Sequence, residues 1–175
     1  MHLSYWGYSF MKEIKLTQGQ IALVDDEDYS VLNSKKWFAR KRKTKYGQDY
    51  YAGININTVK GQRALNMHRY ILSIFDSKIQ IDHIDNNGLN NQKSNLRVAT
   101  NKQNCCNKKV SGIGTSKYKG VTVRKRDGKY VASIKVNYRN KHIGIYIHEV
   151  DAAIAYNEAA IKYFGEFAKL NNIKP

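Results

Sequence analysis

The sequence is poor in several features that would assign a protein to a class at once. Its 175 residues include only two cysteines, the neighbours Cys105 and Cys106. A multi-bridge disulfide framework and a four-thiolate zinc site are therefore excluded, and a reducing cytosol fits. No apolar run approaches the roughly 20 residues that cross a bilayer, so we expect no membrane partner. The first residues also lack the basic leader and small-residue cleavage site of a secretory signal.

Acidic residues are scarce as well. Fourteen Asp and Glu face thirty Lys and Arg, which leaves a formal net charge of +16. A charge this far from zero makes a polyanion the first partner to consider, although ribosomal proteins, RNA binders and membrane-surface proteins share the property. The hydrophobic content of 42% is ordinary for a globular chain. Wholesale disorder is therefore not expected.

The patterning predicts an α+β chain in two parts. Residues 11–109 read as one mixed domain, with a strand near 50–56 and a helix near 65–75. Residues 110–117 are small and Gly/Ser-rich and are predicted to be a linker before a second domain at 118–171. Residues 1–10 are interpreted as an extension without fold, with a short N-terminal strand as the alternative.

The most informative stretch runs from Ile79 to Lys108 (IQIDHIDNNGLNNQKSNLRVATNKQNCCNK). It predicts a strand at 80–83, an Asn-rich loop, a second strand at 96–98 and a helix that starts at Thr100. Thr100 followed by Gln103 fits the capping-box pattern, which fixes that start. This arrangement can bring Asp82, His83 and Asn104 together.

These three residues suit phosphodiester cleavage. An imidazole such as His83 can take a proton from water near neutral pH. Asp82 and Asn104 offer oxygen ligands of the kind preferred by a hard cation, so Mg²⁺ is expected, with Mn²⁺ as the alternative and no small-molecule cofactor. Two protein ligands leave room for water and a substrate phosphate.

The stretch resembles the H-N-H nuclease family with its ββα-metal fold, in the phage and intron-encoded branch. The resemblance implies that Asp82 and Asn104 hold the cation, His83 is the general base, and Asn95 holds the loop and orients the His83 ring. Arg69, in the upstream Met67-His68-Arg69, and Arg97 are expected to contact DNA. One departure is Asn104 in place of the family's final His; it brings no negative charge, so weak metal affinity is expected.

The second domain reads as three short strands at 120–124, 129–136 and 141–147, followed by a helix that stops at Gly165. One face of this helix is expected to pack on the sheet: Val150, Ala153, Ile154, Asn157, Ile161 and Phe164. Alternation along the strands turns Val121 and Val123 inward, with Thr122 outside. Between residues 117 and 148 nine basic residues face one acidic residue.

This pattern resembles the Apetala-two/ethylene-response-factor DNA-binding domain, in which a three-stranded antiparallel sheet backed by one helix lies in the major groove. The residues expected at DNA are Lys119, Thr122, Arg124, Arg126, Ser133, Lys135 and His142. Thr122 and His142 stand where the plant family has Arg and Trp, so the base sequence read by plant members does not carry over.

Together these features predict a homing-type endonuclease of the host cytoplasm and nucleoid that acts on double-stranded DNA. One centre hydrolyses one strand at a time, so a monomer or weak dimer that nicks is expected. Two other classes remain open: a non-catalytic DNA-binding regulator and an RNA-binding accessory protein. Phosphate contacts by the basic cluster 35–45 also remain open, against a merely solvated surface.

Overall fold

The polar and apolar alternation along the chain produces small separate sheets joined by short helices. The computed structural model describes residues 10–44, 47–59, 61–107 and 115–173. The expected extension, except residue 10, and most of the expected linker lie outside these ranges. The chain divides into two units, Met1–Ala99 and Thr100–Pro175. This boundary lies before the end of the first domain expected from the sequence, which was residue 109. The helix that starts after Thr100 therefore belongs to the second unit. The limits of the functional domains stay predictions.

The first unit begins with an antiparallel hairpin and a helix. Strand β1 (Met11–Lys15) pairs with β2 (Ile21–Asp25), and helix α1 (Asp26–Asn33) follows directly. Three acidic residues, Asp26, Glu27 and Asp28, lie in the first turn of α1. Negative charge there interacts favourably with the partial positive charge of the helix N-terminus, which accounts for the acidic patch at this point in the sequence.

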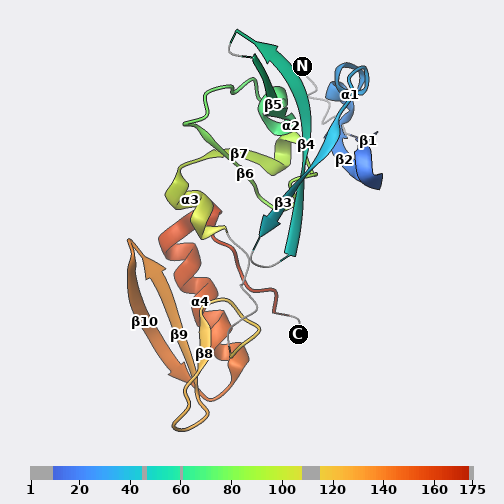
Figure 1. Cartoon of the computed structure of the whole chain (residues 1–175). Helices are drawn as coiled ribbons and strands as arrows, with labels where there is room; N and C mark the ends of the chain where they lie inside the picture. Colours follow the sequence, from blue (N-terminus) through green and yellow to red (C-terminus); the bar gives the residue numbers. More distant parts are fainter. Residues whose placement is uncertain (1–9, 45–46, 60, 108–114, 174–175) are drawn as a thin grey trace, which may run out of the picture. The chain divides into compact units, whose positions relative to one another are not determined.

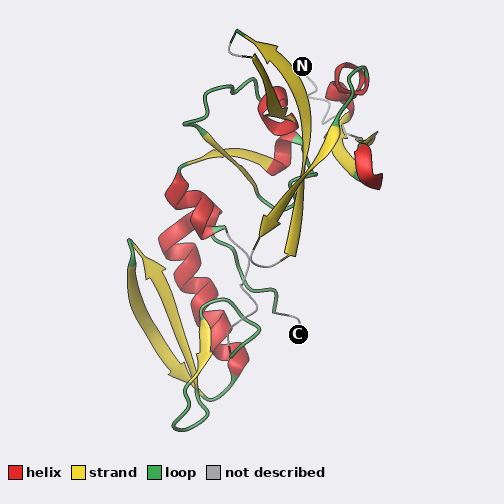
Figure 2. Cartoon of the chain, in the orientation of Figure 1, coloured by secondary structure: helices red, strands yellow, loops and turns green. Residues whose placement is uncertain are grey.

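A second sheet has the order β3-β4-β5 and is antiparallel throughout (Figures 1 and 2). Its strands are β3 (Phe38–Thr44), β4 (Gly47–Thr58) and β5 (Gly61–Asn66), and helix α2 (Met67–Ile71) follows. The helix predicted over 65–75 is thus too long. Leu65 belongs to β5, and after Leu72 the chain turns at Ser73, whose φ is +54°.

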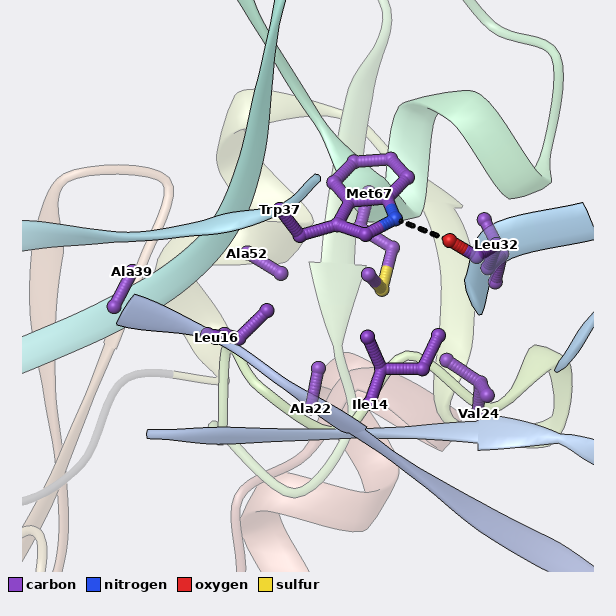
Figure 3. Close-up of a cluster of buried hydrophobic side chains, with 9 residues drawn as sticks. All are labelled: Ile14, Leu16, Ala22, Val24, Leu32, Trp37, Ala39, Ala52 and Met67. Carbon is purple, nitrogen blue, oxygen red and sulfur yellow. Dashed lines mark hydrogen bonds between the residues drawn. The ribbon is translucent and has the colours of Figure 1, made fainter. Parts of the chain in front are cut away.

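The core of this unit joins the hairpin, α1 and the second sheet (Figure 3). Trp37 is its largest member, and the indole Nε1 donates to the Leu32 carbonyl at 2.8 Å, so the polar end of the ring is satisfied inside the core. The buried core residues are Ile14, Leu16, Ala22, Val24, Leu32, Trp37, Ala39, Ala52 and Met67. Leu89, from the Asn-rich loop of the predicted nuclease stretch, packs against this core.

The predicted nuclease stretch forms the expected elements. Strand β6 (Gln80–His83) pairs antiparallel with β7 (Leu96–Ala99), and a short 3-10 helix (Lys93–Asn95) ends the loop between them. In the second unit, α3 (Asn101–Cys106) starts with the predicted capping box: Gln103 N donates to Thr100 Oγ1, and Thr100 N donates to Gln103 Oε1. Both strands and the helix start are therefore confirmed.

The rest of the second unit is a three-stranded antiparallel sheet with the order β10-β9-β8 and a helix packed on it. The elements are β8 (Val121–Val123), β9 (Tyr130–Val136), β10 (Arg139–Tyr146) and α4 (Glu149–Phe164), followed by a 3-10 helix (Gly165–Phe167). Gly165, with φ +53°, ends α4 as predicted. The mixture of small sheets and helices agrees with the predicted α+β class.

The helix face expected against the sheet was wrong in part. Ala152, Ala153, Tyr156 and Ala160 are buried, whereas Ile154 and Ile161 are exposed. Small alanines let the helix approach the strands closely, and Tyr156 lies so near Gly120 that a Cβ there would fall 2.0 Å from its ring. The large isoleucines are consequently excluded from the contact.

Asn157, the polar residue on the predicted face, has hydrogen-bond partners for both ends of its carboxamide. Its carboxamide accepts from Asn171 N at 2.7 Å and donates to Asn171 O at 3.0 Å. In the described part of the chain, no helix is long and apolar enough to cross a membrane.

Candidate active site

The candidate site is built on the β6-β7 pair of the first unit. The register sets Asp82 opposite Arg97 and His83 opposite Leu96. Asp82 and His83 are neighbours in the strand, and both are 6% exposed. Short strands fixed by a ladder hold their side chains in defined directions, so Asp82 and His83, as consecutive residues, project from opposite faces of the β6-β7 pair.

Asp82 is paired with Arg97. The guanidinium Nε and Nη2 donate to the same carboxylate oxygen, Oδ2, at 3.0 and 2.8 Å. The pair is nearly dry, with 12% of the Arg97 side chain and 6% of the Asp82 side chain exposed. The negative charge of Asp82 therefore has a cation beside it, and Arg97, expected at DNA, is engaged within the protein.

His83 lies in a group of three rings. Its centroid is 5.0 Å from that of His68 on α2 and 5.8 Å from that of Tyr51 on β4, both in edge-to-face geometry. The Nε2 atom of His83 is buried. A base covered in this way reaches a water molecule only after the surrounding groups move. The sequence did not identify Tyr51, because it belongs to a distant strand and carries no motif.

The environment of the two histidines keeps both neutral. Burial lowers the pKa of His83 from 6.5, while Asn91, Asp85 and Asp82 act in the opposite direction. Burial, then the neighbouring His83 and Arg69, lower the pKa of His68 to about 3. His68 is 6% exposed. Both rings are thus uncharged near neutral pH, the form that a general base must have before it takes a proton.

The Asn-rich loop is organised around Asp85 and Asn95. Asn95 Oδ1 accepts from Asp85 N at 3.0 Å, while Asn95 Nδ2 donates to Asp85 Oδ1 at 3.0 Å and to Asn90 O at 2.8 Å. Asn95 therefore makes the loop contacts that the resemblance implied. The side chain of Asn91, which is 1% exposed, acts to raise the pKa of His83. Orientation of the His83 ring by Asn95 stays a prediction.

The far side of the loop is tied to β2. Leu23 exchanges backbone hydrogen bonds with the loop, donating to Leu89 O at 2.8 Å and accepting from Asn91 N at 2.7 Å. Asp25 Oδ2 accepts from Lys93 N at 2.7 Å. The hairpin at the start of the unit thus holds the loop that carries Asn91 and Asn95.

Asn104 lies on α3, in the second unit, and is half-buried. Its meeting with Asp82 at a shared cation stays a prediction. Over the described ranges, no group of three or more His, Cys, Asp and Glu side chains gathers to hold a metal ion. The predicted ligand pair consists of one carboxylate and one carboxamide, so it is not a group of this kind.

Arg69 supports the turn after α2. Its guanidinium donates to the carbonyls of Ile74, Asp76 and Ile79 at 3.2, 3.0 and 2.7 Å. These bonds fix the entry into β6. The phosphate contact expected of Arg69 stays a prediction.

In the second unit, the strand register gathers four of the predicted DNA-contacting residues on one face of the sheet. Ser133 pairs with His142, and Thr122 pairs with Val131, which shares its face with Ser133 and Lys135. Thr122, Lys135 and His142 are exposed. These four residues share the face opposite the helix with Val131 and Ile145, and their contact with DNA stays a prediction.

The other three predicted contacts have protein partners or lie in a loop. Lys119 Nζ donates to the Cys106 carbonyl at 2.7 Å, and burial lowers the Lys119 pKa to about 8. Arg124 and Arg126 both form ion pairs with Asp127 in the loop after β8, and the side chain of Arg126 stays 75% exposed. The structure thus distinguishes exposed cations from cations already engaged.

No family model matches the chain, and no solved structure matches it. A protein described as an uncharacterized HNH endonuclease, from Acanthamoeba polyphaga mimivirus, is 34% identical over 161 residues, covering 89% of this chain and 77% of that protein. The similarity thus extends through the β6-β7 site and most of the remaining sequence. Identity of this level over most of both chains shows that the chain belongs to the HNH endonuclease family and is a nuclease, a hydrolase of phosphodiester bonds.

Proposed function

We propose that the chain is a divalent-metal-dependent endonuclease of the homing type that nicks double-stranded DNA. The observation that carries the proposal is the adjacent, buried Asp82 and His83 on β6, with a cation already beside the carboxylate. A bare buried carboxylate is costly, so this position is built to have a positive charge next to it. HNH nucleases generally use a divalent metal, and we propose Mg²⁺ here.

The donor set fits such an ion. Asp82 offers a carboxylate oxygen and Asn104 a carboxamide oxygen, which are ligands suited to Mg²⁺ or Mn²⁺. When bound, the ion would neutralise charge that develops on the substrate phosphate. Arg97 already donates to Oδ2 of Asp82, so a bound ion and the guanidinium would be two positive charges on one carboxylate. Their repulsion would make them competitors for Asp82.

His83 acts on the attacking water. It is neutral near pH 7 and takes a proton in the step that breaks the P–O bond. Asn95 keeps the loop closed through its bonds to Asp85 and Asn90, and the Asn91 side chain interacts with the His83 ring. Substrate and metal binding must also uncover His83 Nε2, which is buried in this structure.

The second unit supplies a surface for duplex binding. Its outer sheet face carries Thr122, Ser133, Lys135 and His142, and a two- or three-stranded sheet of this size can enter the major groove. The sequence resemblance to the Apetala-two type domain supports the same role. Positioning by this sheet and cleavage by the β6 site together constitute the proposed activity.

The test is plasmid nicking by His83→Ala. Supercoiled DNA is incubated with Mg²⁺ or with EDTA, and conversion to open circles is followed. Wild type should nick only with Mg²⁺, and His83→Ala should not nick while still binding DNA in a mobility-shift assay. The matched control is His148→Ala, an exposed histidine before α4. Undiminished nicking by His83→Ala would reject the proposal.

A further inference from the structure

The turn between β9 and β10 has a residue that its backbone does not favour. Val136 and Arg139 are the last paired residues, so Asn137 and Tyr138 alone make the turn. Their φ angles are +51° and +64°. Two-residue hairpin turns with both φ positive strongly prefer Asn-Gly, because glycine has no Cβ to clash in the left-handed region. Asn137 fits this preference, and Tyr138 does not.

The strain at Tyr138 is not offset by packing. The residue is 91% exposed, so its ring gains little from burial in this structure. A large side chain in the left-handed region costs free energy relative to glycine, and such strain is most often kept at sites that bind something. Folding alone therefore gives no reason for a tyrosine at this position.

The surroundings of the turn are basic. Between Lys129 and His148 the sequence has four cations and no acidic residue: Lys129, Lys135, Arg139 and Lys141. Arg139 is exposed, and Lys141 Nζ lies 5.1 Å from the centre of the Tyr163 ring. A hollow beside the turn is lined by Val136, Asn137, Arg139, Lys141 and Tyr163. The Tyr138 ring is exposed beside positive charges that no nearby acidic residue in the sequence balances. Such a surface suits a nucleic acid, which carries phosphates, sugars and bases.

We propose that Tyr138 is a DNA-contacting residue, whose ring packs against sugar and base edges of duplex DNA while Arg139 meets the adjacent phosphate. The inference rests on the proposed function, because it takes duplex DNA as the partner. It adds the tip of the β9-β10 hairpin to the contact surface predicted for the outer sheet face. The turn backbone presents the ring, and Arg139, which follows the turn directly, meets the phosphate beside it.

The proposal predicts opposite changes in stability and in binding. Tyr138→Gly removes the ring and relieves the left-handed strain, so the melting temperature of the full-length chain should equal or exceed that of wild type. Its affinity for a fluorescently labelled random-sequence duplex, measured in EDTA, should fall about tenfold, as expected when one ring contact worth about 1.4 kcal/mol is lost. Tyr138→Phe should bind like wild type.

Two further variants make the test specific. Asn137→Gly changes the same turn and keeps the ring, so its affinity should match wild type. Arg139→Ala should lower the slope of log affinity against log salt by about 0.9, whereas Tyr138→Gly should leave that slope unchanged because it removes no charge.

Either of two results overturns the inference: Tyr138→Gly binding as tightly as wild type, or Tyr138→Gly melting below wild type. If wild type nicks plasmid DNA and the glycine variant binds as tightly as wild type, only this inference fails. If wild type does not bind duplex DNA, the proposed function fails together with it.

Discussion

Asp82 on β6 and Arg97 on β7 form a buried ion pair across the two-stranded sheet, and two guanidinium nitrogens donate to one carboxylate oxygen. Removal of one member of such a pair leaves an uncompensated buried charge, which costs about 3–5 kcal/mol. The same carboxylate is the one proposed to hold the metal, so the ion and the guanidinium would repel each other there. Arg97 therefore stabilises the metal-free chain and competes with the ion.

This relationship predicts how Arg97→Gln behaves. Without metal, the variant should lose about 3 kcal/mol of unfolding free energy, because Asp82 stays buried without its cation. Added Mg²⁺ should restore part of the loss and raise the melting temperature of Arg97→Gln more than that of wild type. Thermal melts with and without Mg²⁺ measure this. Arg97→Lys keeps the charge and serves as the control; equal Mg²⁺ shifts in wild type and Arg97→Gln would contradict the competition.

The pKa of His68 predicts acid sensitivity. Burial lowers it from 6.5 to about 3, so the folded chain keeps His68 neutral while the unfolded chain takes up a proton below pH 6.5. Titration of His68 has no effect on stability above pH 6.5, and the free energy of unfolding falls by about 1.4 kcal/mol per pH unit as pH drops from 6.5 toward 3. The lowered pKa of His83 acts in the same direction.

Urea unfolding at several values between pH 7 and pH 4 measures this loss. His68→Phe keeps a ring and removes the titrating group, so its stability should depend less on pH over this range. The same pH dependence in both proteins would show that His68 is not the group responsible.

Two glycines of the second unit offer a matched comparison. Gly120 (φ +76°) and Gly128 (φ +71°) share the left-handed backbone. At Gly120 an added Cβ would lie 2.0 Å from the Tyr156 ring and 2.7 Å from Ser133 O, whereas at Gly128 nothing lies within 4 Å. Gly128→Ala should cost about 1 kcal/mol from backbone strain alone. Gly120→Ala should cost about 3 kcal/mol or more, because the close helix-sheet contact must also shift. Chemical denaturation would show equal losses if the Tyr156 contact were unimportant.

Local patterns predicted the elements well. Alternation identified β9, helical spacing identified α4, and Thr100 with Gln103 identified the start of α3, because each signal depends on residues a few positions apart. The order Asp82-His83 on a strand followed by an Asn-rich loop also predicted the β6-β7 frame of the site. The buried face of α4 was wrong because apolar residues surround this alanine-rich helix, and only close packing on the sheet selects the alanines.

Contacts between distant segments could not be predicted. Tyr51 and His68 enclose His83 from β4 and α2, and no spacing in the sequence indicates either contact. The pairing of Arg97 with Asp82 follows from the exact register of β6 and β7, in which a one-residue slip would turn every side chain to the opposite face. Lys119 and Lys135 of the second unit are a further example. Both are lysines in basic stretches of the sequence, but Lys119 donates to the Cys106 carbonyl and Lys135 is exposed.

That difference predicts the salt dependence of DNA binding. Lys135 is exposed on the outer face of β9, so it is available to a phosphate. Lys119 is half-buried, and its ammonium donates to the Cys106 carbonyl. Lys135→Ala should reduce the slope of log affinity against log salt by about 0.9, the change expected when one phosphate contact is lost. Lys119→Ala should leave the slope nearly unchanged and lower the melting temperature, because Cys106 O loses its donor.

Fluorescence anisotropy with a labelled duplex at several KCl concentrations provides both slopes, and thermal melts provide the stabilities. Lys125→Ala, at an exposed lysine in the loop after β8, is the control for loss of one surface charge away from the sheet face. An equal fall in slope for Lys119→Ala and Lys135→Ala would mean that Lys119 leaves Cys106 when DNA binds. In that case Lys119 would itself be a phosphate contact, available only in the complex.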